Sequence, residues 1–202
     1  VIMAGGKGTR LDPFTKILPK PLIPINGEPI IKIIMDKFNE YQIKEFHVSV
    51  NHQSRMIKAY FGDIDSAYAI NYIEEEKPLG TAGALRFLTD KIKGPFIVTN
   101  CDIIIDSDYH EILSYHREKA NDITVVGAYR QYVIPYGVCE IKDGGDLKAI
   151  TEKPGYDLLV NTGFCVLQAD VLPYIPKGES YTMTDLIAKV KSRGGRVGVY
   201  PI

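Results

Sequence analysis

A glycine-rich loop near the start of the chain carries two cationic side chains. Residues 4–11 read Ala4-Gly5-Gly6-Lys7-Gly8-Thr9-Arg10-Leu11 and follow a short apolar run. Glycines lack a Cβ, so backbone N–H groups can approach phosphate oxygens closely, and α/β sheets bind ligands at the carboxyl ends of their strands. A tight turn alone would need one glycine. Three glycines with a lysine and an arginine among them favour a cradle for a polyphosphate.

Two better-known phosphate loops do not fit this segment. A P-loop has Ser or Thr after its Gly-Lys pair, whereas Gly8 follows Gly6-Lys7. The dinucleotide fingerprint ends on Gly or Ala, whereas the corresponding position counted from Gly6 is Leu11. The loop is therefore a phosphate loop of another kind. Shortly after it comes Lys20, held between Pro19 and Pro21. Prolines on both sides restrict the backbone, which favours a lysine aimed at an anion over a merely solvated one.

Two acidic segments are candidates for a metal site. Asp102 lies just past the apolar run 96–99, and an aspartate beyond the carboxyl end of a buried strand is typical of a Mg²⁺ ligand beside phosphates. The alternative for Asp102 is a helix cap, although Asp106 is the better candidate cap for the next helix. Asp106-Ser107-Asp108 matches the D-x-D motif of many metal-dependent glycosyltransferases. The alternative is an ordinary helix start without a metal, because aspartates are common there.

A third segment, residues 74–85, joins a strand to a helix. Its part Leu79-Gly80-Thr81-Ala82-Gly83 is unusually small for an ordinary helix start, and small residues allow a flat ring to lie against the backbone. A carboxylate among residues 74–76 could accept hydrogen bonds from guanine N1–H and N2–H. The alternative is a solvated acidic helix start that needs no ligand.

The elements that would position these residues alternate between strand and helix patterns. We expect strands at 46–50, 69–73, 96–99 and 123–129, and helices at 31–38, 56–61, 82–88 and 112–116. This alternation predicts an α/β fold, a Rossmann-like mixed and mostly parallel central sheet flanked by helices. Strands at 137–141, 147–150 and 163–167 predict a mixed or antiparallel extension packed on the first half. Thr182 and Asp185 predict a capped helix.

Composition limits the class of protein. Hydrophobic residues make up 45% of the 202-residue chain, charged residues 24%, and the formal net charge is -1. These values predict one globular domain with no nucleic-acid partner and no membrane span, and the start shows no signal peptide. Cys101, Cys139 and Cys165 are expected to be buried, reduced thiols of a cytoplasmic protein. His47, His52 and His116 are expected to be structural.

Residues 5–31 resemble the signature of the sugar nucleotidyltransferase family, reading GGxGTRLxPxTxxxPKPLIPxxGxPII. The resemblance implies a nucleotide-diphospho-sugar transferase fold, similar to that of GT-A glycosyltransferases. It implies that Arg10 and Lys20 are catalytic, neutralising the triphosphate and the transition state, and that Asp102 holds Mg²⁺. The nucleotide-binding residues would be Ala4, Gly5, Gly6, Gly8, Thr9, Pro78, Gly80 and Thr81.

Later segments resemble the sugar side of the same family. Tyr136-Gly137 resembles its Tyr-Gly step, Glu152-Lys153-Pro154 its Glu-Lys-Pro motif and 160–163 its next sugar-contacting strand. The resemblance implies that Gly137 lies beside the sugar and Glu152 accepts sugar hydroxyls. It also implies that Lys153 binds the sugar 1-phosphate and Asn161 faces the ligand. The nucleotide half would span about 1–120 and the sugar half about 121–202.

The resemblance further implies that the domain is truncated at both ends. The family continues into a W-x-D-x-G segment whose aspartate is a second metal ligand. Segments 134–137 and 183–187 resemble a bacterial subgroup that activates sugar phosphates for surface glycans, some members with GTP, and this favours GTP as the donor. Whether the protein forms a homo-oligomer is open.

The predicted chemistry joins an NTP to a sugar 1-phosphate and releases pyrophosphate. The sugar phosphate is already ionised near pH 7, so no general base is required, and the sequence shows no Ser/His/Asp or Cys/His set. Cations and a metal suffice to hold two polyanions in line. The alternatives are a metal-dependent glycosyltransferase and a non-catalytic nucleotide-binding regulator, and the set Arg10, Lys20, Asp102 and Lys153 argues against the latter.

Overall fold

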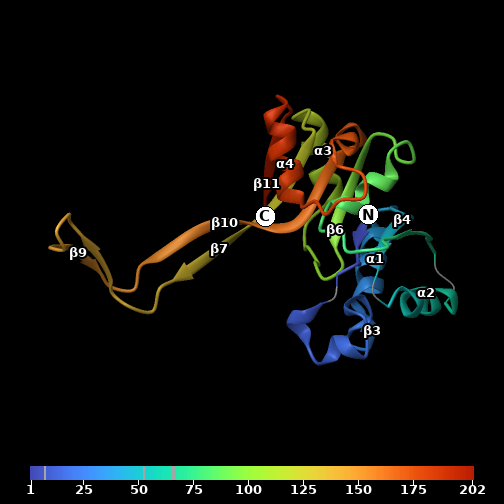
Figure 1. Cartoon of the computed structure of the whole chain (residues 1–202), viewed down its shortest axis with the longest axis horizontal. Helices are drawn as coiled ribbons and strands as arrows, with labels where there is room; N and C mark the ends of the chain where they lie inside the picture. The colour runs from blue at the N-terminus through green and yellow to red at the C-terminus, as the bar shows by residue number, and fades with distance from the viewer. Residues whose placement is uncertain (7, 52, 65–66) are drawn as a thin grey trace.

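The chain forms a seven-stranded, mostly parallel sheet with helices on both faces (Figure 1). The computed structural model describes residues 1–6, 8–51, 53–64 and 67–202. Strand β10 runs antiparallel to both neighbours, and the other pairs of the sheet are parallel. In order across the sheet, the strands are β11 (Val197–Pro201), β7 (Ile123–Val133), β10 (Gly155–Gln168), β6 (Pro95–Asn100), β1 (Ile2–Met3), β4 (Glu45–Val50) and β5 (Ala69–Glu74). The predicted α/β class is confirmed.

Each face of the sheet buries its own hydrophobic core, because neighbouring residues of a strand point to opposite faces. Ile2 and Ile97 belong to one core, while Met3 and Val98 belong to the other. Helices α1 (Ile30–Glu40), α2 (Ser54–Gly62) and α3 (Tyr109–Glu118) contribute to the first core. Helix α4 (Met183–Ser192) and the 3₁₀ helices η4 (Gly83–Leu88) and η5 (Ala169–Tyr174) contribute to the second.

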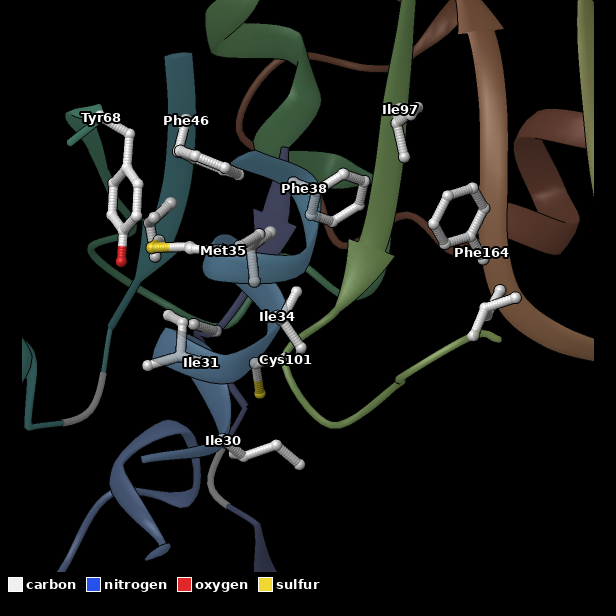
Figure 2. Close-up of a cluster of buried hydrophobic side chains, with 14 of the residues drawn as sticks. Ile30, Ile31, Ile34, Met35, Phe38, Phe46, Tyr68, Ile97, Cys101 and Phe164 are labelled. Carbon is white, nitrogen blue, oxygen red and sulfur yellow. The ribbon is translucent and has the colours of Figure 1, made fainter. Parts of the chain in front are cut away.

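Figure 2 shows the first core, where Phe38 of α1 lies near Ile97 of β6 and Phe164 of β10. The Phe38 ring stacks on the Phe164 ring with a centroid separation of 6.0 Å, and Tyr109 of α3 lies 4.8 Å from Phe38 by the same measure. Such buried aromatic groups supply large apolar area to the core. They hold α1 and α3 against the strands whose ends carry the candidate site.

The N-termini of α4 and α3 can be compared with the caps expected from the sequence. Helix α4 begins with the predicted capping box, in which the Thr182 hydroxyl accepts from the Asp185 N–H and the Asp185 carboxylate accepts from the Thr182 N–H. The cap of α3 is Asp108, which accepts hydrogen bonds from the backbone N–H groups of His110 and Glu111. The expectation for Asp106 was therefore wrong, because α3 begins one residue after Asp108 rather than directly after Asp106.

The helix expected at 82–88 is the 3₁₀ helix η4 rather than an α-helix. The remaining short elements lie mostly near the glycine loop and at one distal point of the molecule. They are η1 (Thr9–Leu11), η2 (Phe14–Lys16), η3 (Lys20–Leu22), the β2 (Pro24–Ile25) and β3 (Glu28–Pro29) pair, and the β8 (Val138–Ile141) and β9 (Leu147–Thr151) pair.

Strands β7 and β10 continue beyond the sheet as a two-stranded ribbon that carries β8 and β9 at its end (Figure 1). We call residues 129–161 the arm. All of them are described; none is buried, and intermediate burial is reached at four positions, Ile134, Val138, Pro154 and Val160. The antiparallel character of this region was predicted, but the β8–β9 hairpin does not pack on the first half. Alternation of apolar and polar residues predicts a strand, but it does not say which part of the molecule packs against the apolar face of that strand.

The thiols differ in their environments. Cys101 and Cys165 are buried as expected, and burial raises the pKa of each to about 12. Cys139 is an exposed thiol on β8, so the expectation of burial was wrong there. No helix of the described residues is long and apolar enough to cross a membrane.

Candidate active site

A cavity of about 540 Å³ opens at the carboxyl ends of β1, β4, β5 and β6. This is the edge at which α/β sheets bind ligands, and the volume suits a small organic ligand. Ten of the predicted residues line it: Gly5, Gly6, Gly8, Thr9, Arg10, Lys20, Pro78, Gly80, Thr81 and Asp102. Ala4 is buried and does not line the cavity, and its N–H donates to the Ser49 carbonyl at 3.0 Å. Lys7 lies outside the described residues.

The glycine loop packs so closely that side chains would not fit at two of its positions. A methyl group at Gly5 would lie 2.6 Å from Glu75 Oε1. At Gly8 the backbone has φ +65, and a methyl group would lie 2.8 Å from Thr15 and 3.1 Å from the Lys20 Cβ. The buried Thr15 hydroxyl donates to the Gly8 carbonyl, at 3.1 Å. Glycine at position 8 therefore allows Lys20 to approach the loop.

The Lys20 ammonium pairs with the Asp102 carboxylate across 82 residues of sequence. Their side chains are 26% and 36% exposed, so both remain accessible from the cavity. The fold brings them together because η3 begins at Lys20 beside the glycine loop and Asp102 follows the end of β6. The two residues predicted to serve the phosphates and the metal thus share one wall.

Residues 78–81 also line the cavity, and hydrogen bonds join the segment 81–83 to the residues just before α4 and at its start. The N–H groups of Ala82 and Gly83 donate to the Tyr181 carbonyl, at 2.9 and 3.1 Å. The Thr81 hydroxyl accepts from the Met183 N–H at 2.8 Å, so it fixes this segment in place. Gly80 has φ +77, and a methyl group there would meet the Tyr181 carbonyl at 2.7 Å.

Of the three consecutive glutamates, Glu75 is the one that faces the cavity. It is 7% exposed, and its Oε2 accepts from the Leu79 N–H at 2.9 Å. Burial raises the pKa of Glu75, while hydrogen bonds from the Leu79 N–H and the Ser49 hydroxyl act in the opposite direction. Glu74 instead pairs with Lys58, and Glu76 is exposed. Ile73 is also buried, so the two-residue strand period could have selected Glu75.

The sugar-side residues all lie on the arm, Asn161 at its base and the other three farther out, and none of them lines the cavity. Asn161 ends the regular β7–β10 ladder, and its Oδ1 accepts from the Gly163 N–H at 2.9 Å. A methyl group at Gly163 would lie 2.6 Å from Asn100 Nδ2, and Asn100 lines the cavity. Gly137, Glu152 and Lys153 lie on the arm and outside the cavity lining. There a methyl group at Gly137 would meet Glu152 Oε2 at 3.0 Å.

The two aspartates of the D-x-D segment make structural contacts. Asp106 pairs with Lys37 at 3.1 Å, Asp108 caps α3, and neither aspartate lines the cavity. Among the described residues, no cluster of three or more His, Cys, Asp or Glu side chains could hold a metal ion.

Two of the three histidines that were expected to be structural are described. His116 is buried between Thr124 and Gln168, and His47 lies 3.4 Å from Glu45. Burial lowers the pKa of both rings. His52 lies outside the described residues.

This arrangement defines an α/β protein in which a glycine loop, the cationic Arg10 and Lys20, and the Asp102 carboxylate line one cavity. The model of the nucleotidyl transferase family matches residues 1–198, so the chain belongs to that family. It is 30% identical to a UTP–glucose-1-phosphate uridylyltransferase of Synechocystis, over 96% of this chain and 55% of the relative. It is 31% identical to a probable glucose-1-phosphate cytidylyltransferase of Bacillus subtilis, over 99% of this chain and 86% of the relative.

A probable mannose-1-phosphate guanylyltransferase of Oryza sativa is 30% identical, over 87% of this chain and 51% of that protein. The chain thus spans about half the length of several curated relatives that it matches. Among solved structures, HddC from Yersinia pseudotuberculosis superposes with a TM-score of 0.76 at 23% identity, covering 99% of this chain and 88% of that one. This likeness establishes the nucleotide-diphospho-sugar transferase fold.

Proposed function

We propose that the chain is the catalytic core of a sugar-1-phosphate nucleotidyltransferase. The observation that carries the proposal is the Lys20–Asp102 pair beside the glycine loop in the cavity. Every relative cited above is named for transferring a nucleotidyl group to a sugar 1-phosphate. In the proposed reaction an oxygen of the sugar phosphate attacks the α-phosphorus of the NTP. The bond from the α-phosphorus to the bridging oxygen breaks, and pyrophosphate leaves with that electron pair.

The residues of the cavity match the charge that this reaction must neutralise. The N–H groups of the glycine loop, Arg10 and Lys20 would bind the triphosphate and stabilise the charge that develops during transfer. No residue has to remove a proton, because the attacking oxygen is already ionised near pH 7. The rate then depends on how closely the two phosphates are held in line.

A magnesium ion fits this donor set. Mg²⁺ is commonly held by one or two carboxylates together with the phosphates of a substrate, and the Asp102 carboxylate lies on the cavity wall with 36% of its side chain exposed. Asp102 would hold the ion, which would supply positive charge to the phosphates. Lys20, which pairs with Asp102 in the structure, would then donate to a phosphate oxygen instead.

We further propose GTP as the donor. The relatives are named as users of UTP, CTP or GTP, so the base must be read by residues of this chain. Glu75 supports guanine because its carboxylate lines the cavity beside Pro78 and Gly80, where a base would lie. Carboxylate oxygens can accept from guanine N1–H and N2–H, whereas the edge of uracil offers one donor.

A panel assay tests the function and the donor together. Mg²⁺ and a set of sugar 1-phosphates are incubated with the chain and each of four NTPs, and pyrophosphate release is followed. We expect release that depends on both substrates and is fastest with GTP. Faster release with another NTP would overturn the choice of GTP alone. Sugar transfer from an NDP-sugar to an acceptor, without pyrophosphate release, would instead support the glycosyltransferase alternative.

A further inference from the structure

The Glu75 carboxyl group is buried, yet it lines the cavity where the proposed function places the base. Its Oε2 accepts from the Leu79 N–H at 2.9 Å, and its Oε1 lies next to Gly5, where a methyl group would come within 2.6 Å. The Asn51 side chain donates to the Glu75 carbonyl, and the Glu75 N–H donates to the Val50 carbonyl at 2.9 Å. Backbone and carboxyl group are therefore both held, so the side chain presents one fixed edge to a ligand.

Glu75 has no ion-pair partner within the described part of the chain, so no cation there holds its carboxyl group in the ionised form. The neighbouring Glu74 pairs with Lys58 of α2, and Glu76 and Lys77 are exposed. Three charged residues share the cavity lining with it: Arg10, Lys20 and Asp102. Burial is the main influence on the pKa of Glu75, and it favours the neutral form.

The two protonation states of a carboxyl group present different hydrogen-bonding edges to a base. An ionised carboxylate only accepts, whereas a neutral carboxyl group donates through its O–H and accepts through its other oxygen. Guanine offers two donors side by side, N1–H and N2–H, and these match the ionised form. Uracil offers the N3–H donor beside a carbonyl acceptor, and this edge matches the neutral form. One fixed side chain can thus pair with either base, depending on its proton.

We propose that the ionisation of Glu75 sets the choice of nucleotide, because the ionised carboxylate selects guanine and the neutral carboxyl group selects uracil. The position of the base rests on the proposed function, whereas the held carboxyl group is a feature of the structure itself. The proton exchanges with water in the cavity. Because burial raises the pKa of Glu75, the preference for GTP over UTP rises as pH increases through this raised value and falls below it.

Binding calorimetry tests the proposal without any turnover. Mg²⁺-GTP and Mg²⁺-UTP are titrated into the chain without a sugar phosphate, from about pH 5 to about pH 8. The ratio of the two affinities is the readout, because both nucleotides carry the same triphosphate and its own titration cancels. We expect the ratio to move towards GTP by about tenfold or more as pH rises. Near the pKa of Glu75, GTP binding should release a proton and UTP binding should take one up.

Glu75→Gln separates the proton from the side chain's shape. An amide donates and accepts as a neutral carboxyl group does, so this variant should favour UTP at every pH, with a ratio that stays flat. Glu76→Gln, at the exposed neighbour, is the matched control and should follow the parent.

Ser49→Ala gives a second test that keeps the Glu75 carboxyl group. The Ser49 hydroxyl forms a hydrogen bond that lowers the pKa of Glu75, so its removal should move the rise of the ratio to higher pH. The Ala4 N–H stays paired in this variant, since it also donates to the Ser49 carbonyl at 3.0 Å.

A ratio that does not change with pH in the parent would overturn the proposal. An equal rise in Glu75→Gln would overturn it too, because another group would then be titrating, and so would a rise that Ser49→Ala leaves in place. Binding of neither nucleotide would contradict this proposal and the proposed function together. If the ratio depends on pH through Glu75 but no NTP and sugar 1-phosphate yield pyrophosphate, the proposed function alone fails. Pyrophosphate release with a preference that ignores pH would mean the reverse.

Discussion

At Lys20 and Asp102, opposite charges from distant parts of the chain meet on one wall of the cavity. A magnesium–triphosphate complex would offer each of them a new partner, a cation for Asp102 and an anion for Lys20. We therefore expect Asp102→Asn to weaken Mg²⁺-dependent NTP binding about tenfold or more, since a lost charge-assisted contact costs ~1.5–3 kcal/mol. Calorimetry measures this, with Asp106→Asn outside the cavity as the matched control. Equal affinity in the Asp102 variant and the parent would remove Asp102 from the metal site.

Glu75 gives the free energy of unfolding a predictable dependence on pH. Burial raises its pKa in the folded state, so the folded protein holds its proton more tightly than the unfolded chain. Its contribution to stability is full below the ordinary carboxyl pKa and falls as pH rises through the raised value. Glu75→Gln removes this loss, so the variant should gain stability relative to the parent as pH increases from 4 to 7.

Denaturant unfolding at several pH values measures the effect of Glu75→Gln. Glu76→Gln, at the exposed neighbouring residue, is the control and should show no such trend. A stability difference between Glu75→Gln and the parent that stays constant with pH would mean that the Glu75 carboxyl is not perturbed by burial.

At the scale of elements, the glycine loop packs closely against Glu75, the residue that follows β5. A methyl group at Gly5 would strike the Glu75 carboxylate at 2.6 Å, and the hydrogen bond from the Leu79 N–H holds that carboxylate in place. Gly6 has nothing within 4 Å of the same position. Gly5→Ala should therefore destabilise the fold by ~1–3 kcal/mol and weaken NTP binding, while the free energy of unfolding of Gly6→Ala should stay within about 0.5 kcal/mol of the parent value.

Unfolding curves of the two alanine variants and NTP titration of Gly5→Ala check this prediction. Unchanged stability in both variants would contradict the close packing of Gly5 against Glu75. Equal losses in both would indicate that backbone freedom, rather than the contact with Glu75, limits the loop.

At the scale of the whole molecule, the two substrate halves should separate in kinetics. Lys20 lines the cavity beside the glycine loop, whereas Lys153 lies on the arm with Glu152. Lys20→Ala should mainly lower kcat, and Lys153→Ala should mainly raise KM for the sugar phosphate, each by roughly tenfold or more. Steady-state kinetics with each substrate varied measures the split. An unchanged sugar-phosphate KM in Lys153→Ala would show that the sugar site lies elsewhere.

The sequence predicted the sheet because apolar alternation and glycine loops are local signals. It also predicted that the glycine loop, Lys20 and Asp102 would meet, since strand ends share one edge of the sheet. Other features depend on surfaces that no local pattern describes. Ile141 and Leu147 lie in strands that were expected to pack on the first half, yet both are exposed on the arm. Cys139, likewise set in an apolar run, is exposed on β8.

The most direct test of the account is a ³¹P NMR time course with Mg²⁺, GTP, a sugar 1-phosphate and the chain. The account predicts that GTP and sugar phosphate signals fall together while pyrophosphate and the diphosphate of an NDP-sugar appear one for one. The Lys20→Ala chain, treated in parallel, should form them at least about tenfold more slowly. Inorganic phosphate without an NDP-sugar, or unchanged substrates with every NTP and sugar 1-phosphate supplied, would contradict it.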